Sequence, residues 1–329
     1  MQRFIAMMGI GLCAAFLGTA HAKDLALSYF MGPAHPMNKA VFTPFAERLE
    51  KVSNGALTVT LYSGGALNSS PPKQYSILLD GVADIAFHLP GYTAQLFPVT
   101  TAITTPGICT TAIECTQALW RGMDVIEKEY DAKLLALWTT EPGVLFSKDK
   151  PIRTIDDMSG MIVRIGSAQN IPFMEALGAS AVSQPVNVIN QNLQNGVVDV
   201  LYIEPGAGTS FKLNEPANYI TTNIPGGGSS FALLMNKTVW NGLSDQEKKW
   251  VDAVAGEDLS LEAAKAYEQA SIKSLNAAAE YGVEIIELSP EERQLWENTM
   301  QPAMNAWFET DLGYGLSGAQ VHKLMRTGD

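Results

Sequence analysis

Two segments of the chain repeat one short pattern. Residues 77–87 read ILLDGVADIAF, and residues 191–202 read QNLQNGVVDVLY. In each segment an apolar helical stretch ends at a glycine, an aspartate follows in the turn, and a short apolar strand begins. Helices that alternate with short apolar strands are typical of α/β proteins with largely parallel sheets. The repeat therefore predicts two similar α/β halves with a cleft between them.

The C-terminal third has a different pattern. Residues 244–282 keep a helical period with few helix breakers, which predicts one long helix or a broken pair. Ser289 and Pro290 are followed by two glutamates, a strong signal for the start of another helix. We therefore expect long helices to close the chain.

Composition excludes several classes of protein. Hydrophobic residues make up 47% and charged residues 17% of the 329 residues, which indicates a globular chain long enough for two domains. The net charge of −12 comes without any Lys/Arg-rich run, so we expect no nucleic-acid partner. The sequence lacks G-x-S-x-G and H-E-x-x-H motifs, and its glycine runs lack a phosphate-loop lysine. We therefore expect no enzyme, no cofactor and no metal.

The N-terminus predicts export. Residues 1–22 contain Arg3, an apolar run and then Ala20-His21-Ala22, the form of a signal-peptidase site. A membrane anchor is the alternative, but the apolar run is short for a span. We expect a secretory signal, a mature chain from Lys23 and a periplasmic location.

Export would place Cys109 and Cys115 in an oxidising compartment. The two sulfurs can meet if Cys109 lies before the helix that Cys115 joins. A structural disulfide and two independent buried thiols both remain open at this stage.

One arginine stands inside an apolar strand. In DDMSGMIVRIGSAQ (156–169), Arg164 follows Met161–Val163 and precedes a glycine and a helix. An unpaired buried guanidinium costs several kcal/mol. Ligands of open α/β sheets bind beyond the carboxyl ends of strands. We therefore expect Arg164 to face the cleft and to find its partner outside the chain; a structural ion pair is the alternative.

At this point the chain resembles a known family over nearly all of its mature length. It is similar to the solute-receptor subunits of tripartite ATP-independent periplasmic (TRAP) transporters. The resemblance is carried by six segments in order: 35–67, 81–108, 154–165 (TIDDMSGMIVRI), 173–182, 192–199 (NLQNGVVD) and 233–251.

The resemblance implies a two-domain α/β fold of the periplasmic-binding-protein type, with a hinge, a ligand cleft and long C-terminal helices. It implies a first domain of residues 23–141 plus 230–269 and a second of 142–229 plus 270–329. The protein would close on an organic anion and deliver it to membrane-embedded TRAP permease subunits. In this family the Arg of the D-x-x-G-x-x-x-R segment pairs with the ligand carboxylate, and Arg164 occupies that place.

The chain also departs from the family pattern. After Asp199 it reads VLYIEP, which lacks both the usual ligand-binding Asn and the Glu-Trp pair associated with a bound cation. Residues 139–147 contain no second Arg. With Arg164 as the one clear cation, we expect a monocarboxylate ligand that the guanidinium holds through two hydrogen bonds. The tyrosines and aliphatic residues at the altered positions suggest an apolar or aromatic remainder.

Eight further residues are candidates for the cleft, and some of them have a plain structural alternative. Tyr202 and Glu204 could be ordinary strand and turn residues, His88 a neutral surface histidine and Trp138 a core residue. The full set beside Arg164 is Tyr202, Glu204, His88, Phe87, Tyr92, His35, Asn187 and Trp138. Two other functions stay open: a receptor that feeds a sensor kinase, and a periplasmic enzyme on the same fold.

Overall fold

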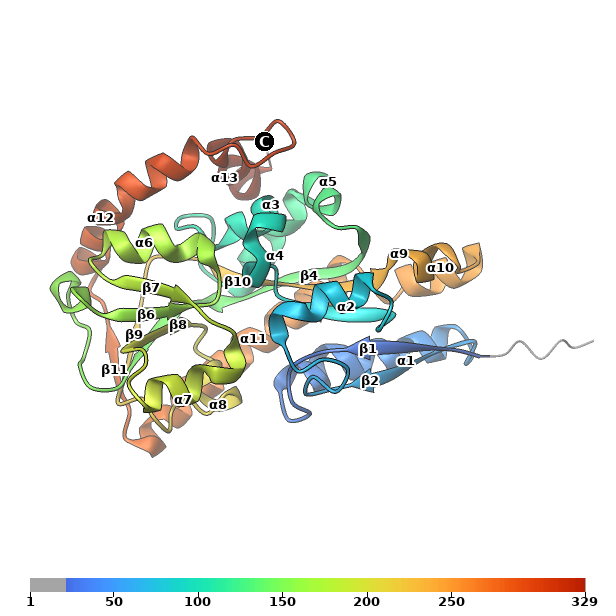
Figure 1. Ribbon diagram of the computed structural model, residues 1–329, viewed down its shortest axis with the longest axis horizontal. Helices are drawn as coiled ribbons and strands as arrows, with labels where there is room; N and C mark the ends of the chain where they lie inside the picture. Colours follow the sequence, from blue (N-terminus) through green and yellow to red (C-terminus); the bar gives the residue numbers. More distant parts are fainter. Residues whose placement is uncertain (1–21, 329) are drawn as a thin grey trace, which may run out of the picture.

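The structure, a computed structural model, describes residues 22–328 and contains two β-sheets (Figure 1). The strand order is β2-β1-β3-β10-β4 in the first sheet and β11-β9-β5-β8-β6-β7 in the second. The first sheet comprises Leu57–Tyr62 (β2), Lys23–Ser28 (β1), Ile85–His88 (β3), Gly228–Asn236 (β10) and Ala132–Pro142 (β4). The second comprises Glu284–Glu287 (β11), Tyr219–Thr222 (β9), Val144–Ser147 (β5), Val200–Ile203 (β8), Ile162–Ile165 (β6) and Ser180–Ser183 (β7). The predicted two-part α/β architecture is confirmed.

Five strands of the second sheet repeat the topology of the first, and β11 is an additional edge strand. Strand β1 is parallel to both β2 and β3, and β6 is parallel to both β7 and β8. Each sheet also holds one strand antiparallel to its neighbours, β10 in the first and β5 in the second. Both of these strands arrive from the other sheet, since β5 follows β4 and β10 follows β9. The chain therefore crosses between the halves twice in extended form.

Helices cover both faces of each sheet, and Figure 1 shows α6 and α7 on opposite sides of the second sheet. The α-helices span Thr43–Val52 (α1), Gln74–Leu79 (α2), Pro98–Thr101 (α3), Ala112–Arg121 (α4), Met123–Ile126 (α5), Ile171–Ala176 (α6), Ile189–Gln194 (α7), Ala207–Ser210 (α8), Lys237–Asn241 (α9), Asp245–Asp252 (α10), Glu257–Ala278 (α11), Pro290–Phe308 (α12) and Gly318–Thr327 (α13). Short 3-10 turns include Pro90–Leu96 (η3), Ala102–Thr104 (η4), Ala168–Asn170 (η7) and Val186–Val188 (η8). The helical region at 244–282 is the broken pair α10 and α11, which separate at Gly256 (φ 88°).

Glycines permit the two crossings. A Cβ at Gly143, between β4 and β5, would overlap the ring of Tyr202. Gly226 has a φ of 155°, and a Cβ there would meet the hydroxyl of Tyr202. A Cβ at Gly228 would overlap the backbone carbonyl of Thr140 on β4. The crossing segments and Tyr202 are therefore packed so closely that side chains are excluded.

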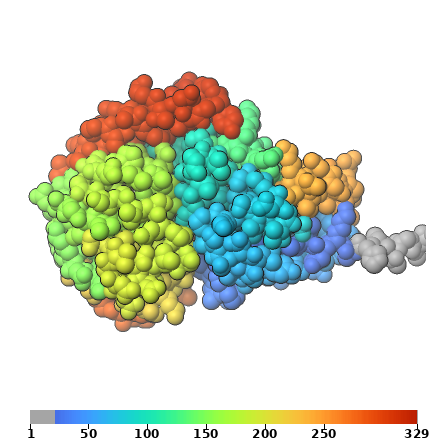
Figure 2. All heavy atoms as spheres, viewed as in Figure 1, coloured from blue at the N-terminus to red at the C-terminus, as the bar shows by residue number. Residues whose placement is uncertain are grey.

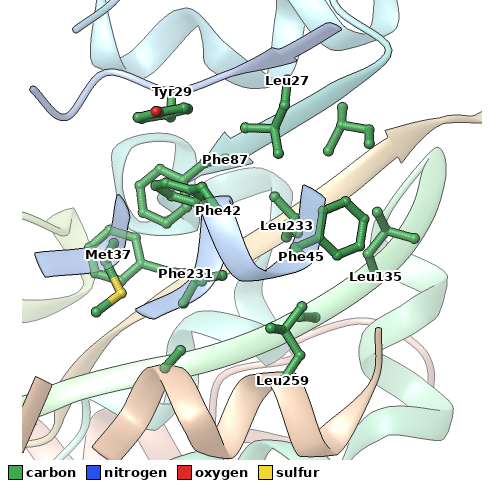
Figure 3. Close-up of a cluster of buried hydrophobic side chains, with 14 of the residues drawn as sticks. Leu27, Tyr29, Met37, Phe42, Phe45, Phe87, Leu135, Phe231, Leu233 and Leu259 are labelled. Atoms are coloured by element: carbon green, nitrogen blue, oxygen red, sulfur yellow. The ribbon is translucent and has the colours of Figure 1, made fainter. Parts of the chain in front are cut away.

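The first sheet buries a large aromatic core on one face. Phe87 of β3 packs against Phe42 and Phe231, with ring centroids 5.4 Å and 4.8 Å away. Figure 3 shows these rings together with Tyr29 inside the cluster. Such pairs are most favourable in tilted or offset arrangements. This core lies directly behind the candidate site described below.

The C-terminal segment packs against both halves. Trp307, Val321 and Met325 belong to a cluster on the first sheet, and Arg121 of α4 donates to the backbone carbonyl of Met325. Helix α12 meanwhile packs against α6 of the second half. Figure 2 shows this segment, in red, across both halves. Residues 270–329 therefore contact both halves, and the predicted domain boundaries remain a prediction.

Cys109 and Cys115 form a disulfide. Cys109 precedes α4, as the pairing requires. None of the helices in residues 22–328 has the length and apolar character needed to cross a bilayer. The predicted signal peptide, residues 1–22, lies outside the described residues except for Ala22.

Candidate functional site

A pocket lies where the two halves meet, beyond the carboxyl ends of β1, β3, β6 and β8. Side chains from both halves line it. The first half lines it with Phe30, Met31, Leu89, Tyr92, Ser229, Phe231 and Tyr267. The second half lines it with Arg164, Gly166, Val186, Tyr202, Ile203, Glu204 and Phe211. Parallel strands and their loops thus form the pocket that their topology predicts.

Arg164 is the buried cation of this pocket. It is 2% exposed on β6, and its Nε and Nη2 donate to the backbone carbonyl of Gln184 at 2.9 Å and 2.5 Å. Burial lowers the pKa of Arg164, while Tyr92 and Glu204 act in the opposite direction. A backbone carbonyl of the chain thus holds the guanidinium, and the expected carboxylate partner outside the chain remains a prediction. One edge of the guanidinium is held by the protein, which fixes its orientation toward the pocket.

Glu204 lies just beyond the end of β8 and is 6% exposed. None of the ion pairs within 4.0 Å among residues 22–328 includes Arg164 or Glu204. Burial raises the pKa of Glu204 to about 7, even though its own backbone N–H and Arg164 favour the charged form. The carboxyl group therefore interacts with the guanidinium without holding it in a tight ion pair.

Aromatic rings form most of the remaining wall. Phe231 and Tyr267 stack with ring centroids 5.7 Å apart and an interplanar angle of 5°. The ring centroids of Phe30 and Tyr92 lie 6.4 Å apart, and Phe211 contributes another ring from the second half. The hydroxyl of Tyr267 is buried and has no hydrogen-bond partner among the described residues. The pocket thus offers flat apolar surfaces around one cation.

Two tyrosines tie the halves together at the pocket. The hydroxyl of Tyr92, on η3 in the first half, accepts from the backbone N–H of Val186 in the second half at 2.9 Å. Tyr202, on β8, packs against Gly143 and Gly226 at the crossings. Burial raises the pKa of Tyr202 to about 12, so its phenol is neutral at physiological pH.

The structure brings together four of the nine predicted site residues: Arg164, Tyr202, Glu204 and Tyr92 line one pocket. Two others form a second layer behind its wall. Phe87 stacks on Phe231, and His35 packs against Phe211 and Tyr267 with centroids 5.6 Å and 6.4 Å away.

Three predicted residues lie elsewhere. His88 points to the opposite face of β3, where Tyr75 and Phe97 enclose it, and neither ring nitrogen has a partner among the described residues. Its burial lowers the pKa of His88 to about 3, so the ring is neutral. Trp138 is a fully buried core residue near Phe87, and Asn187 is exposed.

Sequence reasoning missed several lining residues. Phe30 and Met31 follow β1, and the carboxyl end of that strand could have marked them. Tyr267 is one tyrosine along a 22-residue helix, and no local pattern distinguishes it. Within residues 22–328, no group of three or more His, Cys, Asp or Glu side chains is arranged to hold a metal.

The chain matches a protein family over most of its length. The model of the family described as "Bacterial extracellular solute-binding protein, family 7" matches residues 27–311. The outer membrane transporter protein TsaT of Comamonas testosteroni is 25% identical over 313 residues, 92% of this chain and 90% of that protein. The C4-dicarboxylate-binding periplasmic protein DctP of Rhodobacter capsulatus is 26% identical over 292 residues, 84% of this chain and 83% of that protein.

Solved structures agree with this match. A marine metagenome TRAP solute-binding protein specific for aromatic acid ligands, co-crystallised with 3-hydroxybenzoate, is 28% identical; its TM-score is 0.88, over 93% of this chain and 98% of that one. A TRAP solute-binding protein from Rhodoferax ferrireducens with copurified benzoate is 26% identical; its TM-score is also 0.88, over 93% and 97% of the two chains. Both solved structures are TRAP solute-binding proteins, and the predicted receptor role is confirmed. The chain belongs to the bacterial extracellular solute-binding proteins of family 7, the receptors for small organic acids in TRAP transporters.

Proposed function

We propose that the protein is a periplasmic receptor for a small aromatic monocarboxylate, which it delivers to the permease subunits of a TRAP transporter. The observation that carries the ligand class is the pocket itself, in which one buried guanidinium is surrounded by Phe30, Phe231 and Tyr267. A carboxylate pairs with Arg164, and an aromatic ring occupies the apolar remainder. Two relatives with bound aromatic acids support the same class.

The absence of a second basic residue in the pocket lining supports a single carboxylate. Dicarboxylates and sugar acids need further donors for their additional oxygens, because a buried acceptor without a partner costs about 1–3 kcal/mol. The lining offers mainly rings and aliphatic side chains in those positions. Aromatic monocarboxylates are therefore favoured over both alternatives.

Calorimetry with a panel of acids tests this proposal. We expect benzoate and 3-hydroxybenzoate to bind the mature receptor, and succinate and glucuronate to bind far more weakly. Mass spectrometry of molecules released from the denatured protein provides an independent readout. Tight binding of succinate or glucuronate without binding of an aromatic acid would overturn the proposed ligand class.

A further inference from the structure

Charges in the pocket do not balance once a carboxylate ligand is present. Arg164 contributes one positive charge, and Glu204 contributes a carboxyl group in the same buried space. A ligand carboxylate next to an ionised Glu204 would place two negative charges against one positive charge. In a site with little water, such an excess charge is costly.

The other titratable groups around Glu204 cannot correct this imbalance. Burial raises the pKa of Tyr92 and, well above its usual value, that of Tyr267, so both phenols are neutral. Tyr202 of β8 is neutral for the same reason. His35, behind Tyr267, has its pKa lowered to about 4 by burial. Glu204 alone among these groups can change its charge near neutral pH.

Glu204 is also placed so that it can lose its charge without releasing Arg164. The guanidinium is held by the carbonyl of Gln184 rather than by a tight ion pair with Glu204. Protonation of Glu204 therefore leaves the orientation of Arg164 intact. The two groups can respond separately to a ligand.

We propose that Glu204 takes up one proton when a carboxylate pairs with Arg164, so that the receptor binds its ligand together with a proton. This inference rests on the proposed function. The step is balanced: receptor with ionised Glu204, monocarboxylate and one solvent proton give a complex with neutral Glu204. The remaining Arg164–carboxylate pair has no net charge.

The expected pH dependence has a definite sign. In the free receptor the pKa of Glu204 is about 7 because of burial, and a neighbouring ligand anion raises that pKa further. Affinity is then full below pH 7. Above pH 7 it falls by up to about tenfold per pH unit, until the pKa of the complex is passed. A dicarboxylate adds a second charge that a single proton cannot neutralise.

Calorimetry of benzoate binding between pH 6 and pH 9, in buffers of different ionisation enthalpy, measures this coupling. We expect proton uptake to approach one per benzoate near pH 8 in the unmodified protein, and to vanish in Glu204→Gln. Glu141→Gln is the matched control. Burial also raises the pKa of Glu141 to about 7, but Glu141 lies in a separate cavity beside the first crossing. The Glu141→Gln variant should take up as many protons per benzoate as the unmodified receptor.

Two benzoate derivatives separate charge from size. 3-Nitrobenzoate and isophthalate carry planar groups of similar shape at the same ring position, but only isophthalate gains a charge. We expect the unmodified receptor to prefer 3-nitrobenzoate by about 100-fold or more, and Glu204→Gln, which is neutral like protonated Glu204, to keep this preference.

Three results would overturn the inference: benzoate binding without proton uptake near pH 8, proton uptake that persists in Glu204→Gln, or equal affinity of the unmodified receptor for both derivatives. If that variant does not fold, proton uptake and discrimination by the unmodified protein still decide. Failure of every aromatic acid to bind would overturn the proposed function as well, whereas pH-independent benzoate binding would overturn only the role of Glu204.

Discussion

The two halves of the molecule build their strands with the same device. Gly81 and Gly196 end the preceding helices with φ of 71° and 70°. The aspartate three residues later accepts a 2.8 Å hydrogen bond from a backbone N–H of the neighbouring strand, Asp84 from Ala26 and Asp199 from Ile162. The sequence repeat thus corresponds to a repeat in three dimensions, which sets the register between adjacent parallel strands.

Beyond the carboxyl ends of these strands the two halves differ. The first half lines the pocket with rings, aliphatic side chains and a serine, and with no charged side chain. The second half supplies both charged groups, Arg164 and Glu204. The repeated segments therefore determine the fold, whereas the residues that follow the strands determine what each half contributes to binding.

Removal of Arg164 is the strongest test of this division. Arg164→Ala should weaken benzoate binding by about 2–5 kcal/mol, the range for truncation of one member of a buried charge pair. Arg164→Lys should recover only part of the loss, since an ammonium group lacks the planar fork. Arg153→Ala is the control, because Arg153 pairs with Glu284 on the surface of the same half. Calorimetry at pH 6 measures all three; unchanged affinity in Arg164→Ala would show that the second half does not hold the carboxylate.

The sequence predicted the fold and the charged group for physical reasons. Alternating helices and strands require no knowledge of distant contacts, and a guanidinium inside an apolar strand needs an explanation wherever that strand lies. The hydrogen-bond acceptor that holds Arg164 in the structure was not predictable in the same way. It is the backbone carbonyl of Gln184, a group that every residue possesses. Its position depends on how β6 and β7 are aligned.

The error over His88 has a similar cause. Adjacent residues of a strand point to opposite faces, so Phe87 and His88 could not both face the pocket. Both faces of β3 are buried, with Phe87 in one core and Ala86 in the other. Hydrophobic patterning therefore cannot tell which face leads to the site. Tyr267 was missed because its helix reaches the pocket only through tertiary packing.

The first crossing tests whether the two halves behave as one site. In Gly143→Ala the added methyl group would overlap the ring of Tyr202. Overpacking of this kind lowers the free energy of unfolding by about 1–3 kcal/mol. Binding should weaken as well, because Tyr202 lines the pocket. The cost should shrink in a Tyr202→Ala background, where the overlap is absent. Denaturant titrations measure this coupling, with Gly32→Ala as the control because no atom lies within 4 Å of the added carbon. Equal costs in both backgrounds would contradict the packing at this crossing.

The repeated aspartates give the smallest and most specific test. Asp84 is half-buried and Asp199 is exposed, although both accept hydrogen bonds of the same length. Loss of a hydrogen bond to a charged group costs about 1.5 kcal/mol or more when it is shielded from water, whereas changes at exposed positions usually stay within about 0.5 kcal/mol. Asp84→Ala should therefore reduce the free energy of unfolding more than Asp199→Ala, and Asp84→Asn should retain part of the contact through its amide oxygen. Neither variant should alter the affinity for benzoate, because both aspartates lie at the opposite ends of the strands from the pocket. A change in benzoate affinity with either alanine variant would mean that the repeated segments contribute to binding as well as to the fold, and the division between the two roles would fail.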